Sequence, residues 1–146
     1  MNIIFLTMSN MHGVEDRGIY ADLMRKFRNE GHRLCIVSPR ERRTGEPTSL
    51  QEVGGVQVLG VRTLNLQKTN VIEKGAGQVL VESQFKNAIK KHLGDVKFDL
   101  ILYSTPPITL MGVVKYLKKK NPQATTYLLL KDIFPQNAVD IGMMSK

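Results

Sequence analysis

Short apolar runs alternate along this chain with segments of helical periodicity, and this alternation restricts the fold more than any other feature. Residues 2–7 form an apolar run with the length of a strand buried on both faces. Between Tyr20 and Phe27, apolar side chains recur every three or four residues, as on one face of a helix. Further strand-like runs follow at residues 33–37, 56–61, 99–103 and 125–130. Such an alternation is typical of βαβ units, so we expect a Rossmann-like, doubly wound, mostly parallel α/β sheet of about five strands.

The length of 146 residues is that of one domain with one hydrophobic core, so we treat residues 1–146 as a single domain. No apolar stretch approaches the roughly 20 residues that span a bilayer, and the amino terminus lacks the basic region of a signal peptide. Cys35, the single cysteine, lies in an apolar run, which predicts a buried and unreactive thiol. A lone cysteine fits a reducing compartment, and we expect a cytoplasmic location.

The formal net charge of +8 favours an anionic partner. Nucleic acid, an acidic membrane surface and phosphorylated small molecules all meet this condition. Nucleic acid is disfavoured because the basic residues are scattered, tryptophan is absent, and no zinc-finger spacing occurs. We therefore expect no nucleic-acid partner.

Several kinds of enzyme are excluded by motifs that the sequence lacks. The dinucleotide fingerprint G-x-G-x-x-G is absent, which argues against a nicotinamide cofactor. There is no phosphate-binding G-x-x-x-x-G-K-[ST] loop and no G-x-S-x-G nucleophile elbow. The three histidines lack the spacing of metal ligands, so we expect neither a metal nor a resident cofactor.

Loops at the carboxyl ends of the strands are the natural binding sites of a doubly wound sheet. Residues 8–18 follow the first strand, and the glycines among them leave backbone N–H groups near a helix N-terminus, where they can hold a phosphate or a sugar hydroxyl. The alternative is that the glycines only make the turn and the polar side chains are solvated. Residues 104–107 follow a later strand, and the serine and threonine there either contact ligand or cap the next helix. The candidate binding residues are His12, Gly13, Glu15, Asp16, Gly18, Ser104 and Thr105. A charged segment, residues 39–47, is expected to be a mobile surface loop.

Two segments carry a family resemblance. Residues 98–107 end in S-T-P-P, and residues 131–139 read K-D-I-F-P-Q-N-A-V. Together they resemble the N-terminal domain of bacterial family 4 glycosyltransferases of the WbuB type, which have a similar S-x-P-P turn and a D-L-W-P-x-x-A segment. Those enzymes make lipopolysaccharide O-antigen, capsule or colanic acid. The resemblance covers nearly the whole chain, although Lys131 stands where relatives often have arginine and Phe134 replaces the tryptophan.

The resemblance implies a retaining enzyme of the GT-B fold, in which two Rossmann-like domains face each other across a cleft and no metal is needed. The N-terminal domain holds the acceptor, and a C-terminal domain that is absent from this chain holds most of the nucleotide-sugar donor. Asp132 is then the candidate catalytic residue, hydrogen-bonded to a hydroxyl across the cleft, or else it caps the turn before Pro135. Lys131 lies near phosphate or is exposed.

The leading interpretation is the acceptor-side half of a hexosyltransferase that moves a sugar from a nucleotide-sugar to an acceptor. The acceptor is expected to be a sugar or a polyprenyl-diphosphate-linked sugar at the inner face of the plasma membrane, with peripheral contact to anionic lipid. This chain by itself is expected to be inactive. The alternative is a non-catalytic Rossmann-like module that binds an anionic ligand.

Overall fold

The computed structural model describes residues 1–66, 69–104 and 107–131, which form a six-stranded sheet in the order β3-β4-β2-β1-β5-β6. The strands are β1 (Asn2–Leu6), β2 (Arg33–Glu41), β3 (Ser49–Val53), β4 (Val56–Thr63), β5 (Leu100–Ser104) and β6 (Thr125–Leu129). β3 is antiparallel to β4, and every other neighbouring pair is parallel. The expected Rossmann-like α/β fold is confirmed.

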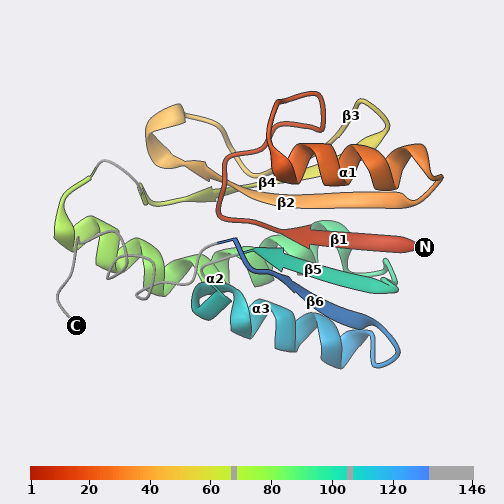
Figure 1. Cartoon of the computed structure of the whole chain (residues 1–146). Helices are drawn as coiled ribbons and strands as arrows, with labels where there is room; N and C mark the ends of the chain where they lie inside the picture. The colour runs from red at the N-terminus through yellow and green to blue at the C-terminus, as the bar shows by residue number, and fades with distance from the viewer. Residues whose placement is uncertain (67–68, 105–106, 132–146) are drawn as a thin grey trace, which may run out of the picture.

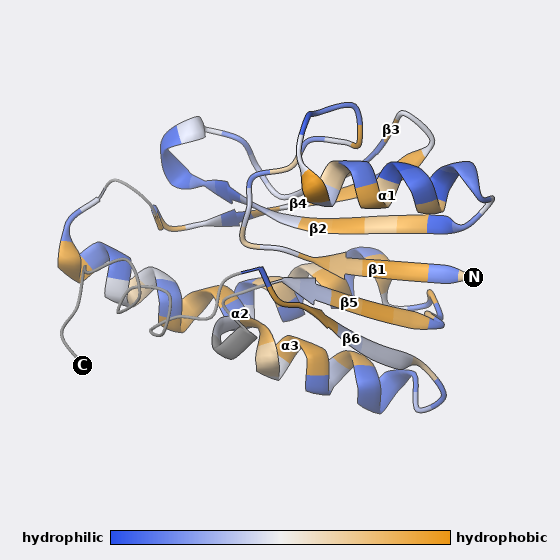
Figure 2. Cartoon of the chain, viewed as in Figure 1, coloured by the Kyte–Doolittle hydropathy of each residue, from blue (hydrophilic) through white to orange (hydrophobic). Residues whose placement is uncertain are grey.

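Helices cover both faces of the sheet. α1 (Ile19–Asn29) lies on one face, and α2 (Val71–Leu93) and α3 (Pro107–Lys120) lie on the other (Figure 1). Strand residues alternate between the two resulting cores: Phe5 packs with α1, whereas Leu6 packs with α2 and α3. Because both faces are buried, the central strands read as continuous apolar runs, and Figure 2 shows them as an apolar layer between the helices. In the described part of the chain, no helix has the length and apolarity needed to cross a membrane.

Local signals mark the end of α1, which the sequence predicts, and the start of α2, which it does not. Gly31 has φ 85 directly after α1, the left-handed conformation with which glycine ends a helix. At the start of α2, the Asn70 side chain accepts a hydrogen bond of 2.7 Å from the backbone N–H of Glu73. Asn70 lies within residues 64–77, where apolar side chains show little periodicity. Apolar spacing alone therefore does not locate the start of α2.

The second strand is longer than its sequence pattern indicates. β2 continues to Glu41, so the expectation of a mobile surface loop is wrong for residues 39–41, which are buried sheet residues. Arg40 can enter the sheet because Gly60 on β4 has no side chain. A Cβ atom at Gly60 would lie 2.9 Å from Nε of Arg40. A short 3-10 turn, η1 (Arg42–Thr44), follows the strand.

The sixth strand, β3, was not expected from the sequence. It is a partly exposed edge strand joined to β4 by Gly54 and Gly55, which have φ 57 and φ 79. Positive φ at both central residues is the requirement of the tight turn that suits hairpins. Here the glycine pair was a sufficient turn signal, but residues 49–53 carry too few apolar side chains to mark a strand.

Cys35 confirms the prediction of a buried thiol. It lies on β2 with 2% of its surface exposed, and burial raises its pKa to about 12. A thiol with such a pKa stays protonated at neutral pH and is a poor nucleophile.

Candidate functional site

Buried polar side chains gather at one edge of the sheet. Six of the seven buried polar or charged residues in the described ranges lie in the carboxyl-terminal half of a strand or directly after it. They are Thr7, Ser38, Arg40, Glu41, Thr63 and Ser104; the seventh, Asn121, lies at the opposite edge. Burial of a polar group is unfavourable unless it is hydrogen-bonded, so such a concentration marks this edge as a candidate site.

At the centre of this edge the strand order reverses: β2 and β4 are added on one side of β1, whereas β5 and β6 are added on the other. β1 and β5 are parallel neighbours, but β1 leads to α1 on one face and β5 leads to α3 on the other. Thr7 directly follows β1, Ser104 is the last residue of β5, and Ser104 Oγ donates to Thr7 Oγ1 over 3.2 Å. The backbone N–H of Ser9 donates to the same Thr7 oxygen over 3.0 Å. Ligands of doubly wound sheets bind at this reversal, so the hydroxyl pair lies where a ligand is expected.

The first part of the glycine-containing loop is held by β2. Ser38 Oγ accepts from the backbone N–H of Met11 over 2.8 Å and donates to the Ser9 carbonyl over 3.0 Å. Arg40 donates to the Met11 carbonyl over 2.8 Å, to Asn10 Oδ1 over 2.9 Å and to Ser38 Oγ over 2.8 Å. The residues that follow β1 are therefore fixed in place before any ligand arrives, which is how a binding loop avoids an ordering cost.

Arg40 keeps its charge in this setting. Only 5% of the residue is exposed, and burial lowers the pKa of the guanidinium, while the Glu46 carboxylate at 3.1 Å acts in the opposite direction. Arginine remains protonated in proteins at neutral pH. The group is thus a permanent cation that organises the loop through its donors.

Three of the predicted loop residues contribute backbone or exposed surface. Gly13 is buried, and a Cβ atom there would lie 3.3 Å from the Val53 side chain on β3. Gly18 is the N-terminal cap residue of α1 and has φ 144, a backbone conformation that favours glycine. His12 is exposed. The two glycines allow the backbone conformation and the close packing that the loop requires.

The two acidic residues of the loop lie over α1, apart from the reversal point. Glu15 forms an ion pair of 2.6 Å with Arg28, which also donates to the Gly54 carbonyl. The guanidinium lowers the pKa of Glu15. Asp16 is exposed, and its carbonyl accepts a hydrogen bond from Arg25. These contacts attach the loop to α1, to the turn between β3 and β4, and thus to the amino-terminal side of β4.

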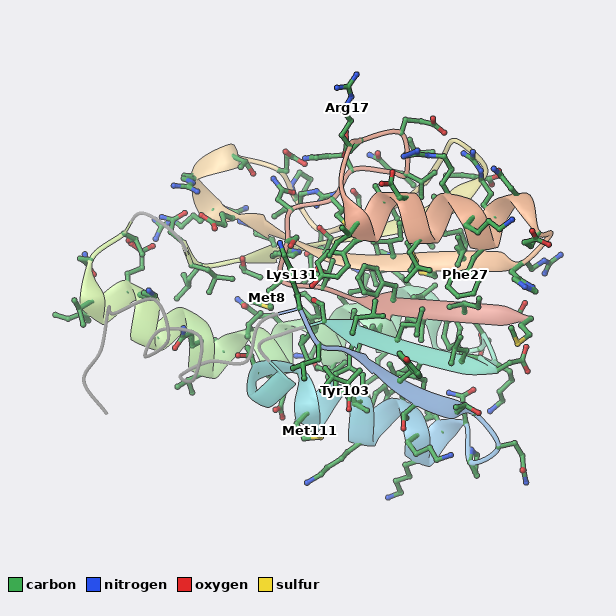
Figure 3. All side chains as sticks on the ribbon, viewed as in Figure 1. Met8, Arg17, Phe27, Tyr103, Met111 and Lys131 are labelled. Carbon is green, nitrogen blue, oxygen red and sulfur yellow. The ribbon has the colours of Figure 1, made fainter. Side chains whose placement is uncertain are left out.

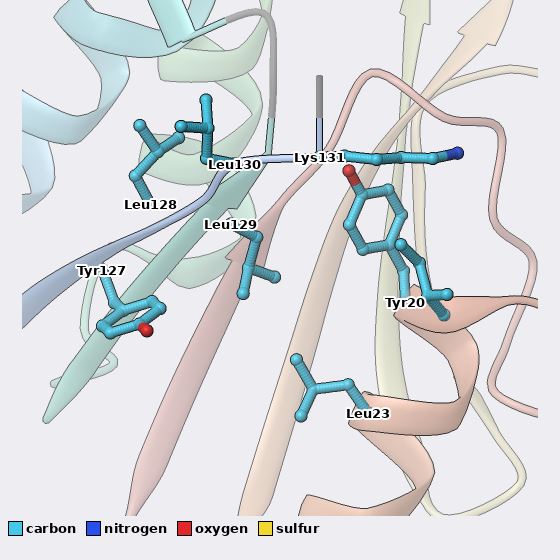
Figure 4. A pocket seen from close by; sticks show the side chains of 8 residues that line it. Tyr20, Leu23, Tyr127, Leu128, Leu129, Leu130 and Lys131 are labelled. Atoms are coloured by element: carbon cyan, nitrogen blue, oxygen red, sulfur yellow. The ribbon is translucent and has the colours of Figure 1, made fainter. Parts of the chain in front are cut away.

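Lys131 lies at the candidate edge, beside a groove between α1 and β6. The groove has a volume of about 390 Å³. Its lining is mainly apolar and consists of Ile19, Tyr20, Leu23, Tyr127, Leu128, Leu129, Leu130 and Lys131. Figure 4 shows the Lys131 side chain extending above Tyr20, and Figure 3 shows Lys131 and Met8 at the same end of the sheet. Thr105 and Asp132, two predicted site residues, lie outside the described residues.

A second, smaller cleft lies beside the carboxyl end of β2. It has a volume of about 150 Å³ and is lined by Met8, Asn10, Pro39, Glu41, Arg43 and Thr44. Glu41 Oε2 lies 2.9 Å from Arg43 Nη2.

Sequence reasoning missed Thr7, Arg40 and Glu41 as site residues, although one signal was present: each comes at or just beyond the end of an apolar strand run. Among the described residues, no cluster of three or more metal-ligating side chains occurs.

Comparisons with known proteins find similarity in structure and none in sequence. No protein-family model matches the chain, and no curated protein matches it. A solved structure described as trehalose-6-phosphate from E. coli bound with UDP-2-fluoro glucose superposes with a TM-score of 0.59 and 13% identity over 92% of this chain. That structure is a GT-B enzyme. This chain has the fold of one GT-B half. The chain spans 34% of the length of that neighbour.

Proposed function

We propose that this chain is the acceptor-side half of a retaining GT-B glycosyltransferase of family 4, similar to the WbuB type. The full enzyme would transfer a hexosyl group from a nucleotide-sugar to an acceptor sugar. The observation that supports this most is the polar edge at the reversal between β1 and β5, on a fold similar to a GT-B enzyme. A C-terminal domain that binds the donor belongs to the proposal, and the neighbour's bound UDP-2-fluoro glucose is consistent with a nucleotide-sugar donor.

In this proposal the role of this half in the reaction is to position the acceptor hydroxyl. Retaining transfer requires the acceptor hydroxyl to be held near the donor carbon while the leaving diphosphate is stabilised. Thr7 and Ser104 offer hydroxyls at the centre of the edge, and Arg40 holds the adjoining loop rigid. In the proposal Asp132 accepts a hydrogen bond from a reacting hydroxyl, and Lys131 supplies positive charge near phosphate. None of these roles needs a metal or a resident cofactor.

A lipid-linked acceptor is the finer part of the proposal. The first turns of α2 extend beyond the carboxyl edge of the sheet (Figure 1). Val71 and Ile72 are 87% and 85% exposed there, and Val79 on the same helix is 78% exposed. Exposed apolar side chains mark contact surfaces, and a net charge of +8 favours anionic lipid. Peripheral contact with the inner face of the membrane would bring a polyprenyl-diphosphate-linked sugar to this edge, as surface polysaccharide synthesis requires.

The test uses the protein made from the complete gene. It is incubated with labelled nucleotide-sugars and lipid-linked acceptors, and transfer is followed by product mass and nucleoside diphosphate release. Ser104→Ala removes one buried hydroxyl of the site and should lower kcat/KM about tenfold, the effect of one hydrogen bond. Glu30→Gln, at the exposed end of α1, is the matched control and should leave transfer unchanged.

Two results would contradict the proposal. One is a complete gene product that ends near residue 146 and transfers no sugar, which would favour the non-catalytic binding module. The other is unchanged transfer in a Thr7→Val, Ser104→Ala double variant, because the proposal places both hydroxyls at the acceptor.

A further inference from the structure

The cleft beside the carboxyl end of β2 contains a buried carboxylate that is ion-paired with Arg43 and keeps spare hydrogen-bonding capacity. We call it the β2 cleft and define it by Met8, Asn10, Pro39, Glu41, Arg43 and Thr44. From it we infer a subsite for one uncharged sugar ring, with the Glu41 carboxylate accepting hydrogen bonds from ring hydroxyls. The inference rests on the proposed function for its place in sugar transfer, but the binding itself can be measured separately.

Glu41 is the observation that points to a ligand. The residue is only 9% exposed, and its Oε2 atom is buried and accepts no hydrogen bond, although Arg43 pairs with it at 2.9 Å. An ionised carboxylate has room for about four hydrogen bonds in two oxygens. Native proteins satisfy buried polar atoms almost everywhere, so an exception that lines a cleft calls for a partner from outside.

A second unsatisfied atom lies on the neighbouring strand. Thr63 pairs in register with Glu41 across β2 and β4, and its Oγ1 is buried without a hydrogen-bond partner. Residues paired across parallel strands project from the same face of the sheet. Two polar groups on one face, at the ends of adjacent strands, therefore share unused hydrogen-bonding capacity at the candidate edge.

The other lining residues match the surface of a sugar. Met8 and Pro39 provide an apolar wall, which suits the C–H face of a ring. The Asn10 amide oxygen is occupied by Arg40, so its NH₂ group is the part left to donate to a hydroxyl. A few directed polar groups on an apolar wall are the usual composition of a small-molecule site.

The charge of the cleft selects an uncharged ligand. Glu41 and Arg43 neutralise each other, and a phosphate placed against Glu41 would be repelled by its carboxylate. The volume of about 150 Å³ equals the share of roughly five waters in the liquid, which is room for one partly exposed ring. Hydroxyl donors add hydrogen bonds to the Glu41 carboxylate without introducing a charge.

The β2 cleft is continuous with the proposed acceptor site through the loop after β1. Met8 and Asn10 belong to that loop, which is fixed to β2 by Arg40 and Ser38. A ring held in the cleft would thus sit beside the reversal point and extend the acceptor toward β2. In the full enzyme this subsite would recognise a sugar of the acceptor chain.

Direct binding is tested by ¹H–¹⁵N NMR on the 146-residue chain. The probes are the methyl glycosides of glucose, galactose, mannose and N-acetylglucosamine. Tetrahydropyran-2-methanol, which has the ring but lacks its secondary hydroxyls, is the control ligand. At least one glycoside should shift the amides of Met8, Asn10, Glu41 and Thr44 saturably, with a Kd on the order of 1–10 mM as expected for a small ligand. The control ligand should not.

Glu41→Gln keeps the shape of the side chain and should weaken that Kd at least tenfold. Glu30→Gln is the matched control and should bind like the unaltered chain. Met8→Trp, which fills the cleft and leaves Glu41 in place, should also abolish binding, so the inference stays testable if Glu41→Gln does not fold. Spectral dispersion reports the fold of each variant.

The inference is overturned if no glycoside shifts the cleft amides, if Glu41→Gln binds normally, or if the shifts map to the groove between α1 and β6. In the complete gene product, Glu41→Gln should raise KM for the acceptor with little change in kcat. Normal transfer in Glu41→Gln beside impaired transfer in Ser104→Ala would refute the subsite and keep the proposed function. Glutamate-dependent glycoside binding in a protein that transfers no sugar would refute the function and keep the subsite.

Discussion

The two edges of the sheet use buried polar groups differently. At the amino edge, both polar atoms of the Asn121 side chain are hydrogen-bonded within the protein: its Oδ1 accepts from the backbone N–H of Phe98 over 2.8 Å, and its Nδ2 donates to the Leu117 carbonyl over 2.9 Å. At the carboxyl edge, the buried Thr63 Oγ1 has no hydrogen-bond partner, and the buried Glu41 Oε2 has an ion pair with Arg43 but no hydrogen bond. The difference indicates that buried polar groups stabilise the fold at the amino edge, whereas at the carboxyl edge some keep hydrogen-bonding capacity for a ligand.

Other polar groups at the carboxyl edge, Arg40, Ser38 and the Thr7–Ser104 pair, make their hydrogen bonds within the protein itself. The comparison therefore separates two kinds of polar residue at this edge. One kind, which includes Arg40, holds the loop after β1 in place. The other kind, Glu41 and Thr63, has hydrogen-bonding capacity that the protein does not use. Three substitutions test this separation, and a fourth tests the ion pair between Glu15 and Arg28.

Arg40→Met should have the largest effect. It removes the donors that hold the loop after β1 and leaves the buried Ser38 hydroxyl and Met11 carbonyl with fewer partners, so we expect a loss of about 3 kcal/mol in the free energy of unfolding. Urea denaturation at neutral pH measures it. Arg17→Met is the control, since Arg17 points into solvent (Figure 3), and should change stability by less than about 0.5 kcal/mol. A loss for Arg40→Met as small as that of the control would show that Arg40 does not build the site.

Asn121→Ala should come next, with a loss of about 2 kcal/mol, because it leaves the buried N–H of Phe98 without its acceptor. The same denaturation experiment applies. Gln123→Ala, two residues further on and exposed, serves as the control. If sugar binding in the β2 cleft fell while stability held, the assignment of Asn121 to structure would be wrong.

Thr63→Val should act in the opposite direction and raise the free energy of unfolding by about 1 kcal/mol, because it replaces an unsatisfied buried hydroxyl by a methyl group of the same shape. Thr126→Val on the exposed face of β6 should be near neutral. A stabilised Thr63→Val would support the view that the carboxyl edge gives up stability for binding. Destabilisation would mean that the hydroxyl already has a partner in solution.

Glu15→Gln should have the smallest effect, and it depends on pH. Arg28 lowers the pKa of Glu15 in the folded protein below its ordinary value of 4.5. The stabilisation is therefore fully present above that ordinary value and is lost as the pH falls through the lowered pKa. We expect Glu15→Gln to be slightly less stable at neutral pH and equal to the unaltered chain at about pH 2. Thermal unfolding across this range measures it, with Glu52→Gln on exposed β3 as the control; a constant gap at all pH values would contradict the ion pair.

Much of the fold was predictable because its signals are local. Apolar runs located β1, β4, β5 and β6 within two residues of their ends, and the stripe from Tyr20 to Phe27 located α1. β3 was missed because an edge strand has one poorly buried face and carries little apolar pattern. The end of β2 was missed because Arg40 and Glu41 are charged, and only the tertiary contacts make their burial favourable.

The candidate site was less predictable than the fold. The loop after β1 and Ser104, the last residue of β5, were correctly placed at one edge by the topology rule for doubly wound sheets. Within that loop, however, Glu15 turned out to pair with Arg28, and Thr7 rather than a loop side chain meets Ser104. Composition shows which groups are polar, but not which of them find a partner inside the protein.

The sequence by itself determined the α/β class, the order of most elements and the burial of Cys35, because each depends on side-chain periodicity over a few neighbouring residues. Only the tertiary structure decided which polar groups meet. Thr7 and Ser104 are separated by 97 positions, and Arg40 is accommodated by a glycine on another strand. Such contacts depend on strand register and on the path of the chain between strands, and both are set by the packing of the whole core.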